Sequence, residues 1–449
     1  MFQRKFSLLI FLFFSTACSN NKQIEKNTFQ LSTKDKALYT LVEKQTFQYF
    51  WDGAEPNSGM ARERFHEDGV YPADDKNVVT TGGSGFGVMA ILAGINNNFI
   101  TRDEGRKRLE RIITFLEKAD RFHGAWSHWI FGETGKVKPF GRKDNGGDLV
   151  ETSFMLQGLL CVRQYFKKGN AKEKDLAQRI DNLWKEVEFD WYRNGKNVLY
   201  WHWSPSYNWE MNFAVTGYNE CLIMYVLAAS SPTHTIPAEV YHEGWARNGA
   251  IKATTTEYGH TLHLSHNGAL DYGGPLFWAH YSYLGLDPDG LKDKYANYWE
   301  EDKNQALINH DWCVDNPKKY TGYGNDSWGL TASYSVKGYA AHSPGKEDRG
   351  VISPTAALGS MPYTPEYSMR AMRHWYNDMK DKLWGPYGFY DAFSETDNWY
   401  PKQYLAIDQG PIVVMMENYR SGLLWKLFMS CPEVRSGLKK LGFESPYLK

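Results

Sequence analysis

Two kinds of predicted helix alternate along most of the chain. Stretches that are apolar on nearly every face, such as 80–99 and 144–166, are followed by charged amphipathic stretches, such as 101–119 and 171–189. A helix that is apolar all round is buried, whereas an amphipathic helix has one face in solvent. A turn rich in Gly, Asp, Asn and Ser precedes most of the apolar stretches. The pattern therefore predicts helix pairs, each with an inner and an outer member.

The pairs recur along the chain after a first helix at Leu38–Phe50. They are expected at 80–99 with 101–119, 144–166 with 171–189, 214–232 with 237–246, 273–288 with 292–309, 325–334 or 353–361 with 366–379, and 406–429 with the short helix after Pro432. About six such pairs predict an all-α fold, an (α/α)6 toroid, with a few short β-hairpins at 197–203 and 259–264. In such a ring the turns before the inner helices gather at one mouth. Thr101 and Glu104 are expected to form a capping box.

The N-terminus has the pattern of a bacterial lipoprotein. A positive start and the apolar run Phe6–Phe14 precede small residues and Cys18, and the run is too short to span a bilayer. We therefore expect a signal peptide at 1–17, a lipidated Cys18 with a flexible tether at 18–35, and one catalytic domain at 36–449. This predicts an exported lipoprotein, in the periplasm or at the cell surface, that contacts the membrane by its lipid anchor only; ordinary secretion and an uncleaved anchor are the alternatives.

Composition narrows the class of ligand. The formal charge of −1 argues against nucleic acid as a partner, and the cysteines beyond Cys18 are expected to be buried small hydrophobic residues. The 17 Trp, 29 Tyr and 24 Phe exceed what a core explains, because several Trp, among them Trp328, stand beside polar residues in turns. Such rings suit the apolar face of a sugar and their neighbours suit its hydroxyls.

Carboxylates cluster where the predicted inner helices begin. Asp144, Asp148 and Glu151 follow one another at the start of one helix, where helix capping is the alternative role for the aspartates. Glu220 precedes a buried helix, so desolvation should raise its pKa and suit it to act as a general acid, unless it is an ion-paired core residue. Asp408 precedes another inner helix; near the positive helix end it should stay ionised and could act as a base, with N-capping as its alternative role.

Other chemistries have weaker support. His260, His263 and His266 lack helical i, i+4 spacing and an interleaved carboxylate, which argues against a metal site. There is no GxSxG motif and no Walker-type phosphate loop, and the glycine-rich 82–87 lacks a preceding strand. We therefore expect neither a metal nor another cofactor.

Long blocks of the chain resemble one bacterial family. The segments 140–160, 209–237, 273–288, 325–333 and 406–428 are similar to the bacterial "putative glucoamylase" proteins, whose characterised members are the β-1,2-glucanases of glycoside hydrolase family 144. The resemblance runs from about residue 36 to the end. It implies an (α/α)6 toroid, hydrolysis of β-1,2-glucan or its oligosaccharides with anomeric inversion, and no metal.

The resemblance also implies roles for single residues. Glu220 would be the general acid and Asp408 the candidate base, and the substrate-binding residues would be Asp144, Asp148, Glu151, Tyr218, Trp328 and Arg64. An inverting glycosidase needs one protonated and one ionised carboxyl with room for a water between them. The alternatives are a non-catalytic glycan-binding lipoprotein, a hydrolase or lyase for a different polysaccharide, and a disaccharide phosphorylase or epimerase. No protein partner is implied.

Overall fold

The apolar segments singled out in the sequence lie at the centre of the molecule. The computed structural model describes residues 29–268 and 271–449, so the expected signal peptide and Cys18 lie outside the described residues. The α-helices are α1 (Thr33–Trp51), α2 (Thr81–Asn96), α3 (Arg102–Leu116), α4 (Leu149–Phe166), α5 (Ala171–Lys185), α6 (Leu222–Ser230), α7 (Tyr298–Asp315), α8 (Pro354–Gly359), α9 (Pro365–Asp378), α10 (Lys380–Leu383), α11 (Ala406–Ser421), α12 (Leu423–Met429) and α13 (Pro432–Lys440).

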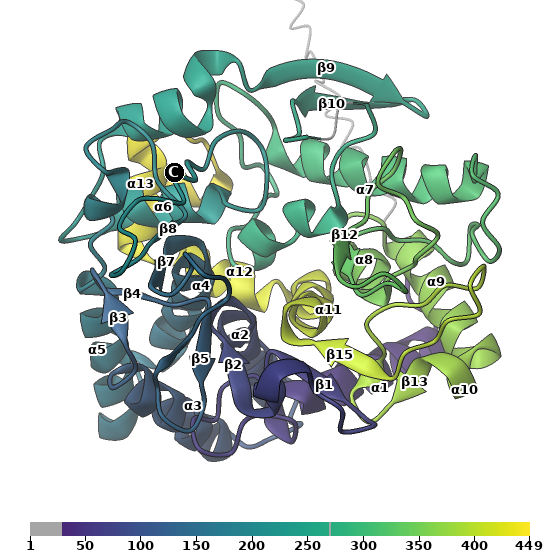
Figure 1. Ribbon diagram of the computed structural model, residues 1–449, viewed down its shortest axis with the longest axis horizontal. Coiled ribbons are helices and arrows are strands. Elements are labelled where there is room, and N and C mark those ends of the chain that lie inside the picture. Colours follow the sequence, from purple (N-terminus) through teal and green to yellow (C-terminus); the bar gives the residue numbers. More distant parts are fainter. Residues whose placement is uncertain (1–28, 269–270) are drawn as a thin grey trace, which may run out of the picture.

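The predicted inner helices pack against one another and the charged helices lie outside them. α2 contacts α4 and α11, α4 contacts α6, and α11 contacts α8 (Figure 1). The short helix η6 (Tyr281–Leu284) contacts both α6 and α11. On the outer side α3 packs on α2, α5 on α4, α13 on α6 and α9 on α8. The fold is therefore mostly helical, and a continuous apolar cluster fills it.

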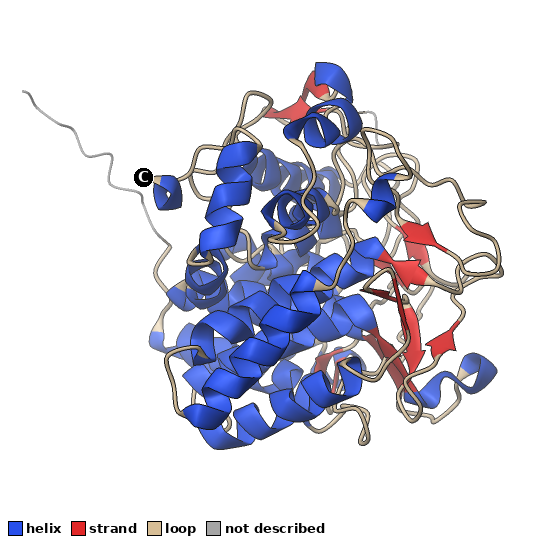
Figure 2. Cartoon of the chain, turned by 90° about the vertical axis from the view of Figure 1, so that its left-hand side faces the viewer, coloured by secondary structure: helices blue, strands red, loops and turns tan. Residues whose placement is uncertain are grey.

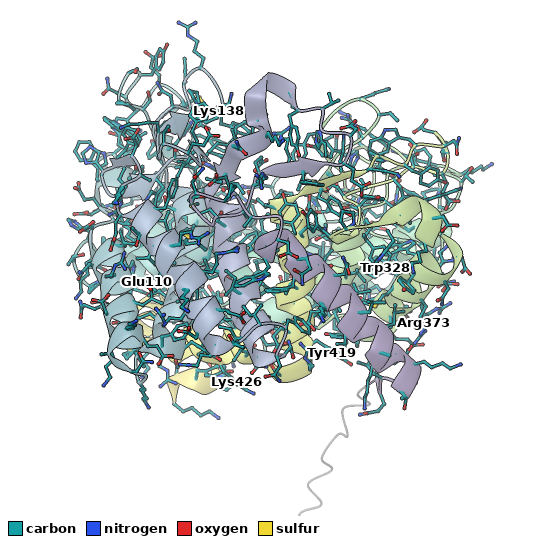
Figure 3. All side chains as sticks on the ribbon, turned by 90° about the horizontal axis from the view of Figure 1, so that it is seen from below. Glu110, Lys138, Trp328, Arg373, Tyr419 and Lys426 are labelled. Atoms are coloured by element: carbon teal, nitrogen blue, oxygen red, sulfur yellow. The ribbon has the colours of Figure 1, made fainter. Side chains whose placement is uncertain are left out.

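Side chains at helix starts behave as their sequence pattern predicts. Thr101 and Glu104 form the expected capping box of α3. Ser32 and Asp35 form another at α1, so this helix begins at Thr33, inside the expected tether. Arg373 of α9 donates to Asp35 at 2.6 Å and joins α9 to α1 (Figure 3). Among the described residues, no helix has the length and apolar content to cross a bilayer.

The strands form small antiparallel sheets, most of them on one side of the helical body (Figure 2). They are β1 (Arg64–His66) with β15 (Gln403–Leu405), β2 (Val78–Thr80) with β5 (Trp129–Phe131) and β6 (Val137–Lys138), β3 (Arg121–Phe122) with β4 (Ala125–Trp126), β7 (Gly147–Asp148) with β8 (His202–Trp203), β9 (Lys252–Glu257) with β10 (His260–Leu264), β11 (Ala332–Ser333) with β12 (Ala340–Ala341), and β13 (Trp384–Gly385) with β14 (Gly388–Phe389). The hairpin expected at 259–264 is present as β9–β10, whereas only the last two residues of 197–203 form a strand.

Three predicted helices are shorter than expected or missing. The segment 273–288 forms only the 3-10 turns η5 (Leu276–Ala279) and η6. Pro275 precedes the first turn, Gly285 follows the second, and His280 between them contacts Ser360 through its ring. The segment 237–246 keeps only the one-turn π-helix η3 (Val240–Trp245). Of the two places expected for the fifth inner helix, 325–334 contains no helix, whereas 353–361 forms the short α8. The remaining short 3-10 turns are η1 (Pro72–Asn77), η2 (Trp191–Arg193), η4 (Arg247–Gly249) and η7 (Pro446–Leu448).

Candidate active site

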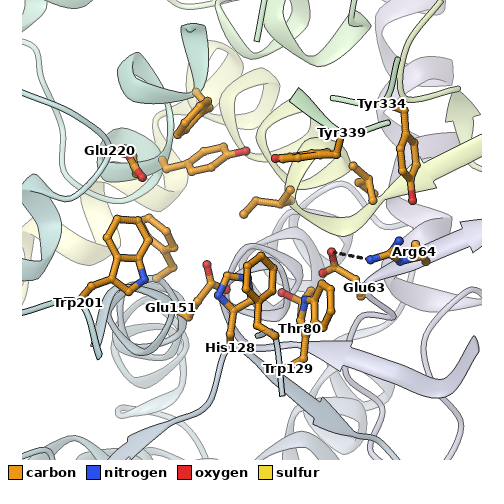
Figure 4. Close-up of a pocket in the computed structure, with 16 residues that line it drawn as sticks. Glu63, Arg64, Thr80, His128, Trp129, Glu151, Trp201, Glu220, Tyr334 and Tyr339 are labelled. Atoms are coloured by element: carbon orange, nitrogen blue, oxygen red, sulfur yellow. Dashed lines mark ion pairs between the residues drawn. The ribbon is translucent and has the colours of Figure 1, made fainter. Parts of the chain in front are cut away.

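A pocket of about 350 Å³ opens where α4, α6 and α11 begin (Figure 4). Aromatic rings and three carboxyl groups dominate its wall. Its lining residues are Glu63, Arg64, Thr80, His128, Trp129, Phe140, Glu151, Phe154, Trp201, Glu220, Phe277, Tyr281, Tyr334, Tyr339, Leu405 and Ile407. A concave site with many rings and a few convergent polar groups is typical of small-molecule binding.

Glu220 lies in the turn just before α6 and reaches the pocket. Its side chain is largely buried, and burial raises its pKa to about 7. The hydroxyl of Ser282, on η6, donates to the backbone carbonyl of Glu220 and fixes this turn against the neighbouring helix. A carboxyl with this pKa keeps a proton up to neutral pH, which a general acid requires.

Asp148 is a fully buried anchor behind the pocket wall. Its Oδ1 accepts the backbone N–H of Glu151 at 2.8 Å and caps α4. Its Oδ2 accepts from Trp201 Nε1 at 2.9 Å and from His128 Nδ1 at 3.0 Å. Asp148 is therefore both the capping residue that its sequence position suggested and the group that orients two pocket-lining rings.

Glu151 faces the pocket one turn into α4. Its Oε2 accepts the backbone N–H of Gly82 at 2.7 Å, and burial raises its pKa to about 7, although the positive charge of His128 opposes the shift. A Cβ on Gly82 would lie 2.5 Å from that oxygen, so this close approach requires glycine. Burial also raises the pKa of the half-buried Asp144 to about 7, and Asp148 adds to that shift.

His128 stands among these acids. Burial alone would lower its pKa, but Glu151, Asp148 and Asp144 raise it to about 10. Among the described residues, His128, Asp144 and Asp148 bring ligand atoms within 4.8 Å of one another, a spacing that could hold a metal ion. These acids favour a proton on His128, so the ring offsets part of their negative charge.

Glu63 is a pocket carboxyl that the sequence analysis missed. It immediately precedes β1, and its backbone pairs with Val78 of β2 and with Ala406 at the start of α11, which brings it to the mouth of the inner helices. Burial raises its pKa, and the nearby positive charges of Arg64 and His128 oppose that rise. Arg64 itself lines the pocket, 3.9 Å from Glu63 and over the ring of Trp129 at 5.3 Å. No local pattern in the sequence marks Glu63.

The prediction that Asp408 stays ionised is wrong. Asp408 lies behind the wall, in the first turn of α11, without capping that helix. Burial raises its pKa well above the usual range, and the neighbouring carboxyls of Asp391 and Glu63 add to the shift. Its carboxyl forms a side-chain hydrogen bond with the Asp391 carboxyl, which requires a proton between them. Within the described part of the chain no N–H group donates to either Asp408 oxygen, so the helix end does not offset the cost of burying its charge.

Of the six expected substrate-binding residues, Arg64 and Glu151 line the pocket, whereas Asp144, Asp148, Tyr218 and Trp328 do not. Tyr218 is fully buried and donates to Asp302 at 2.6 Å. Trp328 is equally buried, and its Nε1 donates to the backbone of Tyr367 on α9 at 3.3 Å (Figure 3). Both are therefore core residues. The four cysteines among the described residues, Cys161, Cys221, Cys313 and Cys431, are buried and free, as expected.

Comparison with known proteins identifies close relatives. Residues 212–432 match the family model described as "Putative glucoamylase". The endo-β-1,2-glucanase of Chitinophaga pinensis, solved with sophorotriose and glucose, is 76% identical, with 93% of this chain and 100% of that chain covered and a TM-score of 0.92. A structure described as a putative glucoamylase, from Bacteroides caccae, is 67% identical, with 92% and 100% covered and a TM-score of 0.90.

A longer relative comes from Parabacteroides distasonis. It is named exo β-1,2-glucooligosaccharide sophorohydrolase (non-reducing end) and is 47% identical over 94% of this chain. The present chain spans only 60% of the length of that protein.

Proposed function

Since the chain belongs to the family of the "Putative glucoamylase" model and of the Chitinophaga pinensis endo-β-1,2-glucanase, we propose that it hydrolyses β-1,2-glucan or its oligosaccharides. The pocket supports this proposal on its own chemistry. It joins aromatic rings, which suit sugar faces, to carboxyls whose pKa values near 7 suit proton transfer. Glu220 is the single observation that carries it, because a buried carboxyl at the pocket with a pKa of about 7 is poised to donate a proton.

We propose that Glu220 protonates the leaving oxygen while a second carboxyl activates water. The resemblance assigns that base to Asp408. The pKa values of Asp408 and Asp391 are raised together, and Glu63 adds to both shifts. The base therefore acts within a group of three interacting carboxyls, Glu63, Asp391 and Asp408. Like charges in such a group resist full ionisation, so one carboxyl holds a proton while an ionised neighbour can accept a proton from the attacking water.

This mechanism predicts inversion at the anomeric carbon. Proton NMR of freshly cleaved β-1,2-glucan should show the α-anomer first, and a first-formed β-anomer would contradict it. Within the group of three carboxyls, Glu63→Gln and Asp408→Asn compare Glu63, which lines the pocket, with Asp408 as the base. A loss of several orders of magnitude in kcat for Asp408→Asn, with a smaller loss for Glu63→Gln, supports Asp408; the reverse order assigns the base to Glu63.

The finer architecture and the location are also proposals. The inner-on-outer packing supports an (α/α)6 toroid whose mouth holds the pocket, although η5 and η6 replace one inner helix. We further propose that residue 18 is lipidated and that the enzyme acts in the periplasm or at the cell surface. Metabolic labelling with a fatty acid should mark the wild type and not Cys18→Ala.

A further inference from the structure

An exposed phenylalanine extends the aromatic wall of the pocket outward. Phe213 is 54% exposed and does not line the pocket. Its ring stacks on the ring of Trp201, which lines the pocket, with the ring centroids 5.4 Å apart and the ring planes at 27°. The stacked pair joins a ring of the pocket wall, Trp201, to the exposed ring of Phe213.

The backbone and Asp148 hold this pair in place. The Trp201 N–H donates to the Phe213 carbonyl at 2.9 Å, and the first residue of α4, Leu149, donates to the Trp201 carbonyl at 2.7 Å. The indole N–H of Trp201 is fixed to Asp148 Oδ2. These bonds fix the Trp201 ring and the Phe213 backbone, so the binding of a ligand on this pair costs less conformational entropy than it would on mobile side chains.

Single exposed aromatic rings are common on protein surfaces, but Phe213 stands beside the pocket, stacked on one of its lining residues. A volume of about 350 Å³ is at the small end of ligand pockets, so a long polysaccharide must extend past its wall. A ring that continues the wall offers the apolar face of the next sugar a place to stack.

We propose that Phe213, stacked on Trp201, binds a glucosyl residue of the substrate chain just outside the pocket. The ligand is the apolar face of a hexose in a β-glucan chain, and the site favours substrates longer than the pocket can hold. This inference rests on the proposed function, since it takes the pocket as the place of cleavage.

The test compares two substitutions across a ladder of β-1,2-gluco-oligosaccharides up to the polymer. Phe213→Leu keeps an apolar side chain but removes the flat ring. It should raise KM for long chains about tenfold, which corresponds to about 1.4 kcal/mol of binding free energy. The kcat and the KM of the shortest cleaved oligosaccharide should stay nearly unchanged. Phe213→Tyr keeps the ring and should behave like the wild type. Tyr258→Leu, at an exposed aromatic residue between β9 and β10, is the matched control.

The outcomes separate the inference from the proposed function. If the KM of Phe213→Leu is unchanged at every substrate length, or raised equally at every length, the outer binding surface is refuted. Cleavage by the wild type would still support the proposed function. No cleavage of any β-1,2-glucan by the wild type overturns both. An equal effect of Tyr258→Leu on long chains would also contradict the inference.

Discussion

Replacing Asp148 by serine tests how the pocket wall is held. A serine hydroxyl can still cap α4, but it is too short to accept from Trp201 Nε1 and His128 Nδ1. An indole N–H left without its partner costs about 1–3 kcal/mol, and the loss of a buried partner for a charged ring adds to this. Asp148 is fully buried and the His128 side chain is 19% exposed, so we expect a total loss of about 3–5 kcal/mol in the free energy of unfolding.

The loss should depend on pH through His128. Its folded pKa of about 10 lies above its unfolded value of 6.5, so the stability it contributes is complete below pH 6.5 and is lost as pH rises through 10. Asp148→Ser lowers the folded pKa of His128. The difference between wild type and variant should therefore be largest at pH 6 and smaller at pH 10.

Urea unfolding at pH 6 and pH 10, with NMR titration of the histidine ring protons, measures both effects. The matched control is Asn170→Ala, which removes a helix cap from α5 away from the pocket and should cost about 1 kcal/mol at either pH. If Asp148→Ser costs no more than Asn170→Ala at pH 6, or leaves the pKa of His128 at about 10, Asp148 does not anchor the wall.

Three further predictions follow from single groups in the structure. The value of kcat/KM should fall as pH rises through about 7, because Glu220 then loses the proton it must donate; activity that is constant from pH 6 to 9 would contradict this. Burial raises the pKa of the fully buried Glu43 to about 8, against 4.5 in the unfolded chain, so its stability contribution is complete below pH 4.5 and is lost as pH rises through 8. In urea unfolding, the free energy of unfolding of Glu43→Gln should therefore rise relative to that of the wild type by roughly a few kcal/mol between pH 5 and 9. Parallel plots of the free energy of unfolding against pH for the two proteins would refute the shift. Gly82→Ala should displace the Glu151 carboxyl and lower kcat at least tenfold, and unchanged kinetics would mean that its position is not needed.

The parts of the site that could be predicted belong to local patterns. Glu220 and Glu151 were found because a charged residue at the start of an apolar helix must be buried, and both line the pocket with raised pKa values. The capping roles of Thr101 and Asp148 followed from their positions before helices. Such features depend on a few neighbouring residues.

The parts that could not be predicted depend on tertiary contacts. Glu63 is placed at the pocket by backbone pairing with β2 and with the β15–α11 junction, the latter some 340 residues later in the chain. The helix end at Asp408 was expected to hold its charge, but its burial beside Asp391 outweighs that effect. The family resemblance implied sugar-binding roles for Tyr218 and Trp328, yet their polar atoms bind protein partners in the core.

The most direct test of the account is the cleavage of linear β-1,2-glucan by the wild type and by Glu220→Gln, with the products separated by size. The account predicts sophorose or longer β-1,2-linked oligosaccharides from the wild type and a loss of several orders of magnitude in kcat for the variant, whose amide keeps the size of the side chain but cannot donate the acid proton. Cleavage that survives Glu220→Gln would contradict the assignment of the acid, and a wild type that leaves the glucan intact would contradict the proposed function itself.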